Sequence, residues 1–220
     1  MFDFINAEVI AVTKPVVDYI PDSEGIIAYA ARVSSPDNQS NFETAAKLLK
    51  YCINHKHFSV FETTNLVMQV EAPRDIARQL LRHRSFTFQE FSQRYAQAQN
   101  FCYREARMQD TKNRQNSIET DDDNLKYNWQ IKQEEVLRLV KDNYKWALDN
   151  GIAKEVARVI LPEGNTMSRL YVNGTVRSWL HYCDLRDGNG TQLEHVDLAQ
   201  KCKVGILKYF PFLDEVWDSI

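Results

Sequence analysis

The chain has 220 residues, of which 44% are hydrophobic and 26% charged, so it can bury a substantial core and has the composition of a globular protein. A formal net charge of −3 argues against a non-specific nucleic-acid binder, so any basic site must be local. No secretory signal, long apolar run or lipidation motif is present, and the four cysteines form no C-x-x-C pair. We therefore expect a cytoplasmic protein with reduced thiols, no membrane partner and one domain over residues 1–220.

An early strand and two helices are predicted near the N-terminus. Residues 9–12 form a short apolar run and predict a strand. Asp22 or Ser23 is a suitable N-cap for a first helix. Ser40 and Glu43 have the spacing of a capping box ahead of a second helix, whose apolar side chains recur with helical periodicity.

A further strand leads into a helix that carries three arginines. Alternating apolar and polar residues predict the strand over residues 63–72. Pro73 then opens a helix in which Arg74, Arg78 and Arg82 recur at every fourth position and line one flank. Like charges on one flank repel each other, so we expect an anion or an acidic partner beside them.

Residues 82–95 hold the densest set of chemically useful side chains. Every basic residue from Arg74 to Arg107 other than His83 is an arginine, whereas a solvated surface normally includes lysine. Arginine is suited to planar, bidentate recognition of phosphate or carboxylate. Interleaved aromatic residues indicate that 85–94 is an anchored loop or irregular strand at a helix end, where binding residues are common. The alternative is structural: the arginines stabilise the helix end and the aromatic loop belongs to the core.

The middle of the chain combines a polar segment with the longest helix. Residues 104–124 are rich in charged and amide side chains, which predicts a long, mobile surface loop. A helix over residues 125–150 follows, closed by Gly151 in a left-handed cap. Its expected buried side chains are Trp129, Val136, Leu137, Val140, Tyr144, Ala147 and Leu148.

Four elements are predicted in the last third of the chain. They are a short helix over residues 153–161, a strand over 167–172, a helix over 176–186 and a final helix. Thr191 and Glu194 have capping-box spacing ahead of that final helix.

The arginine-rich segment resembles the signature of the flavin-dependent thymidylate synthases, which is Arg-His-Arg, two residues, Ser, four residues, Ser, one residue, Arg. In this sequence it reads Arg82-His83-Arg84-x-x-Thr87-x-x-x-x-Ser92-x-Arg94. Five of its six fixed positions match, and Thr87 keeps the hydroxyl of the serine that it replaces. The resemblance covers most of the chain, from about residue 30 to residue 194.

The resemblance implies a set of flavin contacts. By position they are Ser34, His57, Ser59, Arg82, His83, Arg84, Glu90, Arg177 and His181. Two positions depart from the family pattern, because Thr175 and His181 stand where members carry asparagine. A metal site is not predicted, since His55 and His57 have no carboxylate or cysteine at matching spacing. The chain has no G-x-G-x-x-G, so arginines, hydroxyls and helix ends would hold the flavin.

The resemblance also implies the contacts to dUMP and the catalytic groups. The substrate-binding positions are Gln79, Arg82, Glu90, Ser92, Gln93, Arg94, Arg158 and Arg186. Arg186, with Arg158, matches the guanidinium that would stabilise negative charge on the uracil ring during methylation. Ser92 has no positioned base to make it a nucleophile, so we assign it binding. The open alternative for Glu90 is a salt bridge to Arg84 or Arg94. Gln192 and Glu194 resemble a Gln-x-Glu of the family, but capping suffices to explain them.

The family's reaction implies FAD reduced by NADPH, methylenetetrahydrofolate as carbon donor, and no cysteine nucleophile on the enzyme. We expect an α+β fold with a central, largely antiparallel sheet flanked by helices, assembled as a homotetramer whose active sites are shared between subunits. Two rivals stay open from the sequence. One is a non-catalytic nucleotide- or RNA-binding module that uses the same arginines and aromatic residues. The other is a degenerate relative that binds dUMP without turnover.

Overall fold

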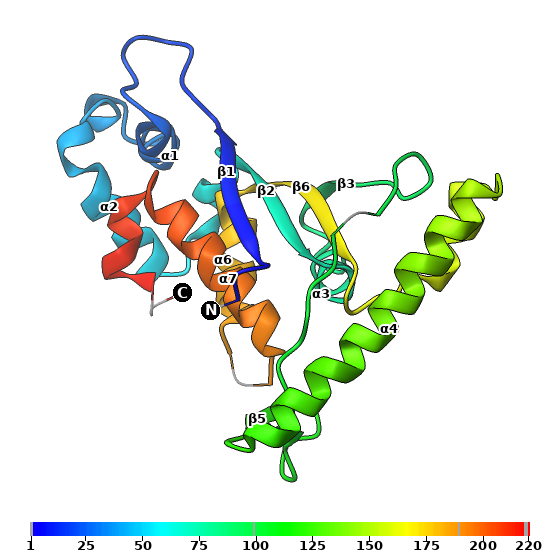
Figure 1. The fold of residues 1–220 in the computed structure, drawn as a ribbon. Helices are drawn as coiled ribbons and strands as arrows, with labels where there is room; N and C mark the ends of the chain where they lie inside the picture. The colour runs from blue at the N-terminus through cyan, green and yellow to red at the C-terminus, as the bar shows by residue number, and fades with distance from the viewer. Residues whose placement is uncertain (1, 99, 189, 218–219) are drawn as a thin grey trace.

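The computed structural model describes residues 2–98, 100–188, 190–217 and 220, and is built on a four-stranded antiparallel sheet (Figure 1). Its strands are β1 (Asn6–Val12), β2 (Asn65–Pro73), β6 (Met167–Thr175) and β3 (Thr87–Glu90), in the order β1-β2-β6-β3. Every pairing in it is antiparallel. The predicted α+β fold with a central antiparallel sheet is confirmed.

The central pair of strands, β2 and β6, carries the core. Leu66, Met68 and Val70 alternate with half-buried residues along β2 and are fully buried. Met68 pairs with Val172 of β6, so the apolar side chains of the two strands share one face. The strand predicted over 167–172 continues to Thr175 because Asn65 at the start of β2 extends the ladder to that residue.

Helices cover the sheet and extend beyond it. The α-helices are α1 (Ser23–Ala31), α2 (Ala45–Asn54), α3 (Arg74–Leu80), α4 (Asp123–Asp149), α5 (Lys154–Ala157), α6 (Val176–Arg186) and α7 (Leu193–Leu207). Short 3-10 turns are η1 (Pro36–Asn38), η2 (Phe42–Thr44), η3 (Phe58–Glu62), η4 (Arg158–Ile160) and η5 (Pro211–Glu215). Figure 1 shows α6 and α7 behind β1 and β2. The long helix α4 runs diagonally at the lower right, beyond α3 and away from α6 and α7. None of the described helices is both long and apolar enough to cross a membrane.

One predicted N-cap and the predicted C-terminal glycine are correct, and two predicted capping boxes are wrong. Asp22 caps α1 by accepting from the Gly25 N–H, as predicted. The predicted capping box at Ser40 is wrong, because the turn η2 intervenes and α2 begins at Ala45 without a side-chain cap. The box at Thr191 is also wrong, since α7 is preceded by Gln192 without a side-chain cap. Gly151 closes α4 with a φ of 76°, as predicted.

Residues 104–124 do not form the structureless loop that their composition predicts. They contain a hairpin of β4 (Arg107–Gln109) and β5 (Ser117–Glu119). The Asp110 carboxylate holds its turn by accepting from the backbone N–H groups of Lys112 and Asn113 and from the Asn116 amide. These hydrogen bonds lower the pKa of Asp110. Composition missed the hairpin because its stability comes from one carboxylate rather than from apolar burial.

The long helix α4 begins two residues before its predicted start and buries fewer apolar side chains than predicted. Leu137, Tyr144 and Ala147 are buried, but Trp129 is 44% exposed and Val136 is 51% exposed. The prediction assumed that the apolar stripe of this helix packs within its own subunit. Part of that stripe faces outward instead.

The contact between Gly174 of β6 and the Phe86 ring provides a test of the packing at the end of the sheet. A Cβ atom at residue 174 would lie 2.3 Å from Phe86 Cδ1, and that ring is itself packed 4.4 Å from the Trp179 ring. We expect Gly174→Ala to lower the free energy of unfolding by about 1–3 kcal/mol, because the buried ring must move. Urea denaturation measures this change. Gly164→Ala is the matched control, since its Cβ would meet nothing within 4 Å; equal effects of both variants would contradict the packing argument.

Candidate active site

Two of the three arginines predicted on the flank of α3 have acidic partners within the chain. Arg74 Nη1 lies 3.3 Å from Glu90 Oε1, and Arg78 Nε lies 3.0 Å from Glu163 Oε1. Glu90 also accepts from the Ser168 hydroxyl at 3.0 Å. Glu90 therefore forms a salt bridge, but with Arg74 and not with Arg84 or Arg94, as the alternative predicted. The expected acidic partner exists, and Glu90 is engaged on the α3 side of the sheet.

Among the arginines predicted to bind ligands, four have no carboxylate partner within the described residues. They are Arg82, Arg84, Arg158 and Arg186. Arg82 and Arg84 are exposed just beyond the end of α3. Guanidinium groups without an internal counter-charge are available to a bound anion. The segment after α3 therefore keeps the character that its composition predicts.

His83 connects this segment to α6. Arg186 Nε donates to His83 Nε2 across 2.9 Å, so the imidazole accepts at that nitrogen. Burial, Arg186 and Arg82 together lower the pKa of His83 to about 4. The ring is therefore neutral at pH 7 and adds no charge beside Arg186.

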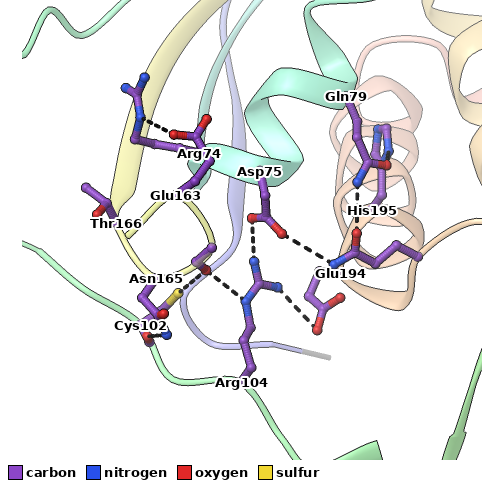
Figure 2. Close-up of polar contacts among 12 residues, drawn as sticks. Arg74, Asp75, Gln79, Cys102, Arg104, Glu163, Asn165, Thr166, Glu194 and His195 are labelled. Carbon is purple, nitrogen blue, oxygen red and sulfur yellow. Dashed lines mark hydrogen bonds and ion pairs between the residues drawn. The ribbon is translucent and has the colours of Figure 1, made fainter. Parts of the chain in front are cut away.

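A chain of hydrogen-bonded side chains that the sequence did not predict connects Tyr182 of α6 to Asp75 of α3. His195 Nε2 lies 3.1 Å from the Tyr182 hydroxyl and His195 Nδ1 lies 3.1 Å from Gln79 Oε1. Gln79 Nε2 donates to Gln192 Oε1 at 2.8 Å, and Gln192 Nε2 donates to Asp75 at 3.5 Å. Figure 2 shows Gln79 and His195 side by side between α3 and α7. His195 gave no sequence signal, because a histidine in an apolar helix is ordinarily a core residue.

Asp75 at the end of this chain belongs to a buried charge cluster around Glu194. Arg104 Nη2 lies 2.6 Å from Asp75 Oδ1, while Arg104 Nη1 lies 3.2 Å from Glu194 Oε1 (Figure 2). Arg107 Nη2 lies 2.5 Å from the same Glu194 oxygen. Burial raises the pKa of Glu194, but the two arginines outweigh it and hold that pKa below its usual value. Glu194 is thus neither a cap nor a free acid.

A second group of predicted residues gathers where η3 packs against α6. Arg177 forms an ion pair with Glu62, and the His181 ring lies 4.8 Å from the Phe58 ring. His57 and Ser59 are exposed at the start of the same turn. Four of the predicted flavin contacts therefore share one surface. Ser34 is exposed in the turn after α1, a helix that also packs against η3.

A third group lies around the loop after β3. Arg94 Nε is 3.3 Å from Glu155 Oε2, and Arg158 Nε donates to the Glu155 carbonyl. Gln93 is buried, and its side-chain Nε2 has no hydrogen-bond partner among the described residues. Among the described residues, the Ser92 hydroxyl contacts only the backbone N–H of Arg94, so no base activates it. No described contact joins this group to His83 and Arg186, so one chain does not bring Arg158 and Arg186 together.

The four cysteines are unsuited to nucleophilic catalysis. All are buried, and burial raises their pKa values, that of Cys102 to about 11. A thiol with a raised pKa has little thiolate at neutral pH. What the site offers instead is anion binding by unpaired arginines together with a neutral imidazole and fixed amides.

Comparisons with known proteins agree on one family. The family described as "Thymidylate synthase complementing protein" matches residues 15–212. A "Probable flavin-dependent thymidylate synthase" of Paramecium bursaria Chlorella virus 1 is 50% identical over 217 residues, which cover 98% of this chain and 100% of that protein. The "Flavin-dependent thymidylate synthase" of Synechocystis sp. is 47% identical over 211 residues, covering 94% and 96%. Among solved structures, the UMP/dUMP methylase PolB of Streptomyces cacaoi bound with 5-Br dUMP has a TM-score of 0.80 at 25% identity, covering 98% and 95%.

The Glu194 cluster gives a prediction about stability and its dependence on pH. Glu194→Gln leaves Arg107 without a carboxylate and Arg104 with Asp75 alone, so we expect a loss of about 3 kcal/mol in the free energy of unfolding at pH 7. Because the folded-state pKa of Glu194 lies below its value of 4.5 in the unfolded chain, this stabilisation is present above pH 4.5 and is lost as pH falls through the folded-state pKa. Urea titrations from pH 7 down to pH 3 should therefore show the gap between wild type and variant closing.

The control is the exposed pair of Lys132 and Glu135 on α4, whose side chains are more than half exposed. Glu135→Gln should change stability by less than about 1 kcal/mol at every pH. A Glu194→Gln variant as stable as this control would show that the buried cluster contributes nothing.

Proposed function

The chain belongs to the family of flavin-dependent thymidylate synthases, and from this membership we propose that it catalyses the reductive methylation of dUMP to dTMP. FAD is the cofactor of that family; NADPH as its reductant and methylenetetrahydrofolate as the carbon donor complete the reaction. The observation that carries the proposal is the segment after α3, where Arg82 and Arg84 lack acidic partners and neutral His83 accepts from Arg186. An RNA-binding module would need the same cations, but the relatives named above are enzymes.

We assign the dUMP phosphate to the loop after β3. Arg94, the Ser92 hydroxyl and the backbone N–H of Gln93 supply charge and hydrogen-bond donors there. The existing partner of Arg94 is an exposed carboxylate of Glu155, and an exposed ion pair costs little to open. A doubly charged phosphate would replace that carboxylate.

The pyrimidine ring must become electron-rich at C5 before C5 can attack the one-carbon unit, so the negative charge that builds up on the ring requires stabilisation. Arg186 performs this task in our proposal, with Arg158 contributing from the loop side. Because His83 is neutral, the imidazole that contacts Arg186 adds no further cation there. Gln79, Arg82 and Glu90 contact the remaining polar groups of the nucleotide.

The flavin is held by the surface that η3 and α6 form. Ser34, His57, Ser59, Arg177 and His181 lie on that side, and Arg82, His83, Arg84 and Glu90 complete the set. Unpaired arginines fit a pyrophosphate that no glycine-rich loop is present to bind. FAD supplies the reducing equivalents of the reaction, while these residues bind and orient it.

Two departures from the family signature have structural uses. Thr87 Oγ1 accepts from the Asn173 amide at 3.3 Å within the β3–β6 ladder. Thr175 caps α6 by accepting from the Ser178 N–H. Both hydroxyls are thereby engaged in the fold, so neither departure removes a contact on which the proposal depends. The buried cysteines support a mechanism in which no enzyme thiol attacks dUMP.

The assembly that we propose is a homotetramer with shared active sites. Leu125, Trp129, Val136 and Leu139 are exposed along one stripe of α4, next to its buried face. An apolar stripe of this kind is typical of a protein–protein interface. A second copy of the chain would also supply the residues that one chain keeps apart, namely the Arg158 group and the Arg186 group.

Replacement of Arg186 tests the chemistry. We expect Arg186→Ala to retain FAD and to lose at least about 100-fold in the rate of dTMP formation, because the developing charge on the ring is no longer stabilised. Stopped-flow turnover and the visible flavin spectrum measure the two effects. Arg114→Ala, at an exposed hairpin arginine, is the control and should be fully active. Wild-type protein that keeps no flavin band, or whose band dUMP does not perturb, would contradict the proposed function itself.

Replacement of Val136 tests the assembly. A glutamate at this exposed position of the stripe should shift the molar mass from tetramer toward smaller species, because a charge would be buried at the interface. Sedimentation equilibrium measures the mass. Arg138→Ala changes the net charge by the same amount on the opposite side of α4 and should leave the mass unaltered. A variant Val136→Glu with the wild-type mass would remove this stripe from the interface.

A further inference from the structure

We propose that His195 is a positioning residue, which holds the Gln79 amide so that one of its N–H groups faces a carbonyl oxygen of the dUMP pyrimidine. The inference rests on the proposed function, since it takes Gln79 to be in contact with the nucleotide. It adds to that function a buried histidine and a tyrosine that touch neither substrate nor cofactor. Their role follows from the direction of the hydrogen bonds in which they take part.

The direction is determined at Asp75. The Asp75 carboxylate is paired with Arg104 at 2.6 Å and can only accept. Gln192 must therefore turn its amide N–H toward Asp75 Oδ2, which leaves Gln192 Oε1 facing Gln79. Gln79 in turn must donate from Nε2, across 2.8 Å. The reverse orientation of these amides would place the Gln192 oxygen against a carboxylate oxygen, which is repulsive.

His195 completes the same direction. With its amide nitrogen turned to Gln192, Gln79 presents Oε1 to His195 Nδ1, so that nitrogen carries the proton. Burial and the nearby Arg186 lower the pKa of His195 to about 3, so the ring is neutral and Nε2 is an acceptor. The Tyr182 hydroxyl donates to Nε2 at 3.1 Å. Every donor in the chain from Tyr182 through His195, Gln79 and Gln192 to Asp75 thus points the same way.

Burial restricts the movement of the His195 and Tyr182 side chains. His195 is fully buried and Tyr182 nearly so, and both nitrogens of the imidazole have partners. Gln79 is half-buried, so it is the member of the chain that stands between the core and the surface beside Arg82. Its Nε2 bears two hydrogens, and Gln192 takes one. The second N–H is a donor, and the oxygen of the same amide is occupied by His195.

This polarity defines what Gln79 can recognise. A fixed N–H donor fits the O2 or O4 carbonyl of uracil and does not fit the N3–H, which is itself a donor. If His195 did not hold Oε1, the Gln79 amide could rotate and present its oxygen in place of its N–H. Gln79 would then no longer distinguish a carbonyl from the N3–H of uracil. The histidine therefore acts on dUMP through Gln79, and it should affect nucleotide affinity rather than flavin retention.

The test compares dUMP with its 2-thio and 4-thio analogues on FAD-loaded protein by titration calorimetry, because sulfur is a weak acceptor at the position of a carbonyl oxygen. Wild-type protein should bind one of the two analogues about tenfold more weakly than dUMP. In His195→Leu, dUMP affinity should fall about tenfold and the preference for oxygen should largely disappear. His195→Asn has an amide that can donate from the place of Nδ1. This variant should recover most of the dUMP affinity and most of the preference for oxygen.

Two further variants keep the test decisive. Leu198→Ala, on the same buried face of α7, should lower the melting temperature without altering either affinity, which separates positioning from loss of stability. Gln79→Leu alters a half-buried side chain and should show no preference between oxygen and sulfur, even if His195→Leu fails to fold. A wild-type preference for oxygen that persists in His195→Leu, or in Gln79→Leu, would overturn the inference. Failure of wild-type protein to bind FAD or dUMP would instead count against the proposed function.

Discussion

The buried carboxylate of Glu194 is the group on which the arrangement around the site depends. It is fully buried, and it is reached by Arg104, which precedes the β4–β5 hairpin, and by Arg107, the first residue of β4. A carboxylate in that position would be strongly destabilising alone, so the arginines must be present whenever the chain is folded. Arg104 and Arg107 in turn lie 5.4 Å and 5.7 Å from the rings of Phe4 and Phe2. One carboxylate therefore ties the N-terminal segment, the hairpin and α7 together, and through Arg104 it orients Asp75 and the chain of amides beyond it.

Two groups of arginines near the candidate site differ in burial and in pairing. Arg74, Arg104 and Arg107 are largely buried and paired with carboxylates, so their charges stabilise the fold and are not available to a ligand. Arg82 and Arg84 are exposed and have no such partner among the described residues. The division explains how a chain with a net charge of −3 can still present a strongly cationic site. Acidic residues neutralise the arginines that support the fold, whereas Arg82 and Arg84 remain available to the anion that we propose binds beside them.

The sequence was most informative where the signal is local. The alternation along residues 63–72, the Asp22 cap and the glycine after α4 each depend on neighbours within a few residues, and each prediction is confirmed. The capping boxes at Ser40 and Thr191 failed because the same spacing serves other contacts, and Glu194 found partners about 90 residues away. Periodicity placed the exposed face of α4 inside, because an apolar stripe has the same pattern whether it is exposed or faces the core. The resemblance named Gln79 but could not reveal His195, whose use depends on a tertiary contact between α3 and α7.

The pairing of Arg186 with His83 shows why a guanidinium is needed there. Arg186 uses its Nε–H to reach His83, which orients the group and leaves the four N–H bonds of its two Nη atoms for other partners. A lysine in this place would have to choose between the imidazole and the substrate, because its three donors radiate from one atom. The imidazole can accept only while it is neutral, and its pKa of about 4 ensures that it is neutral throughout the physiological range. A base that stays uncharged beside two arginines thus holds the orientation of Arg186 and leaves its Nη groups available to the substrate that we propose.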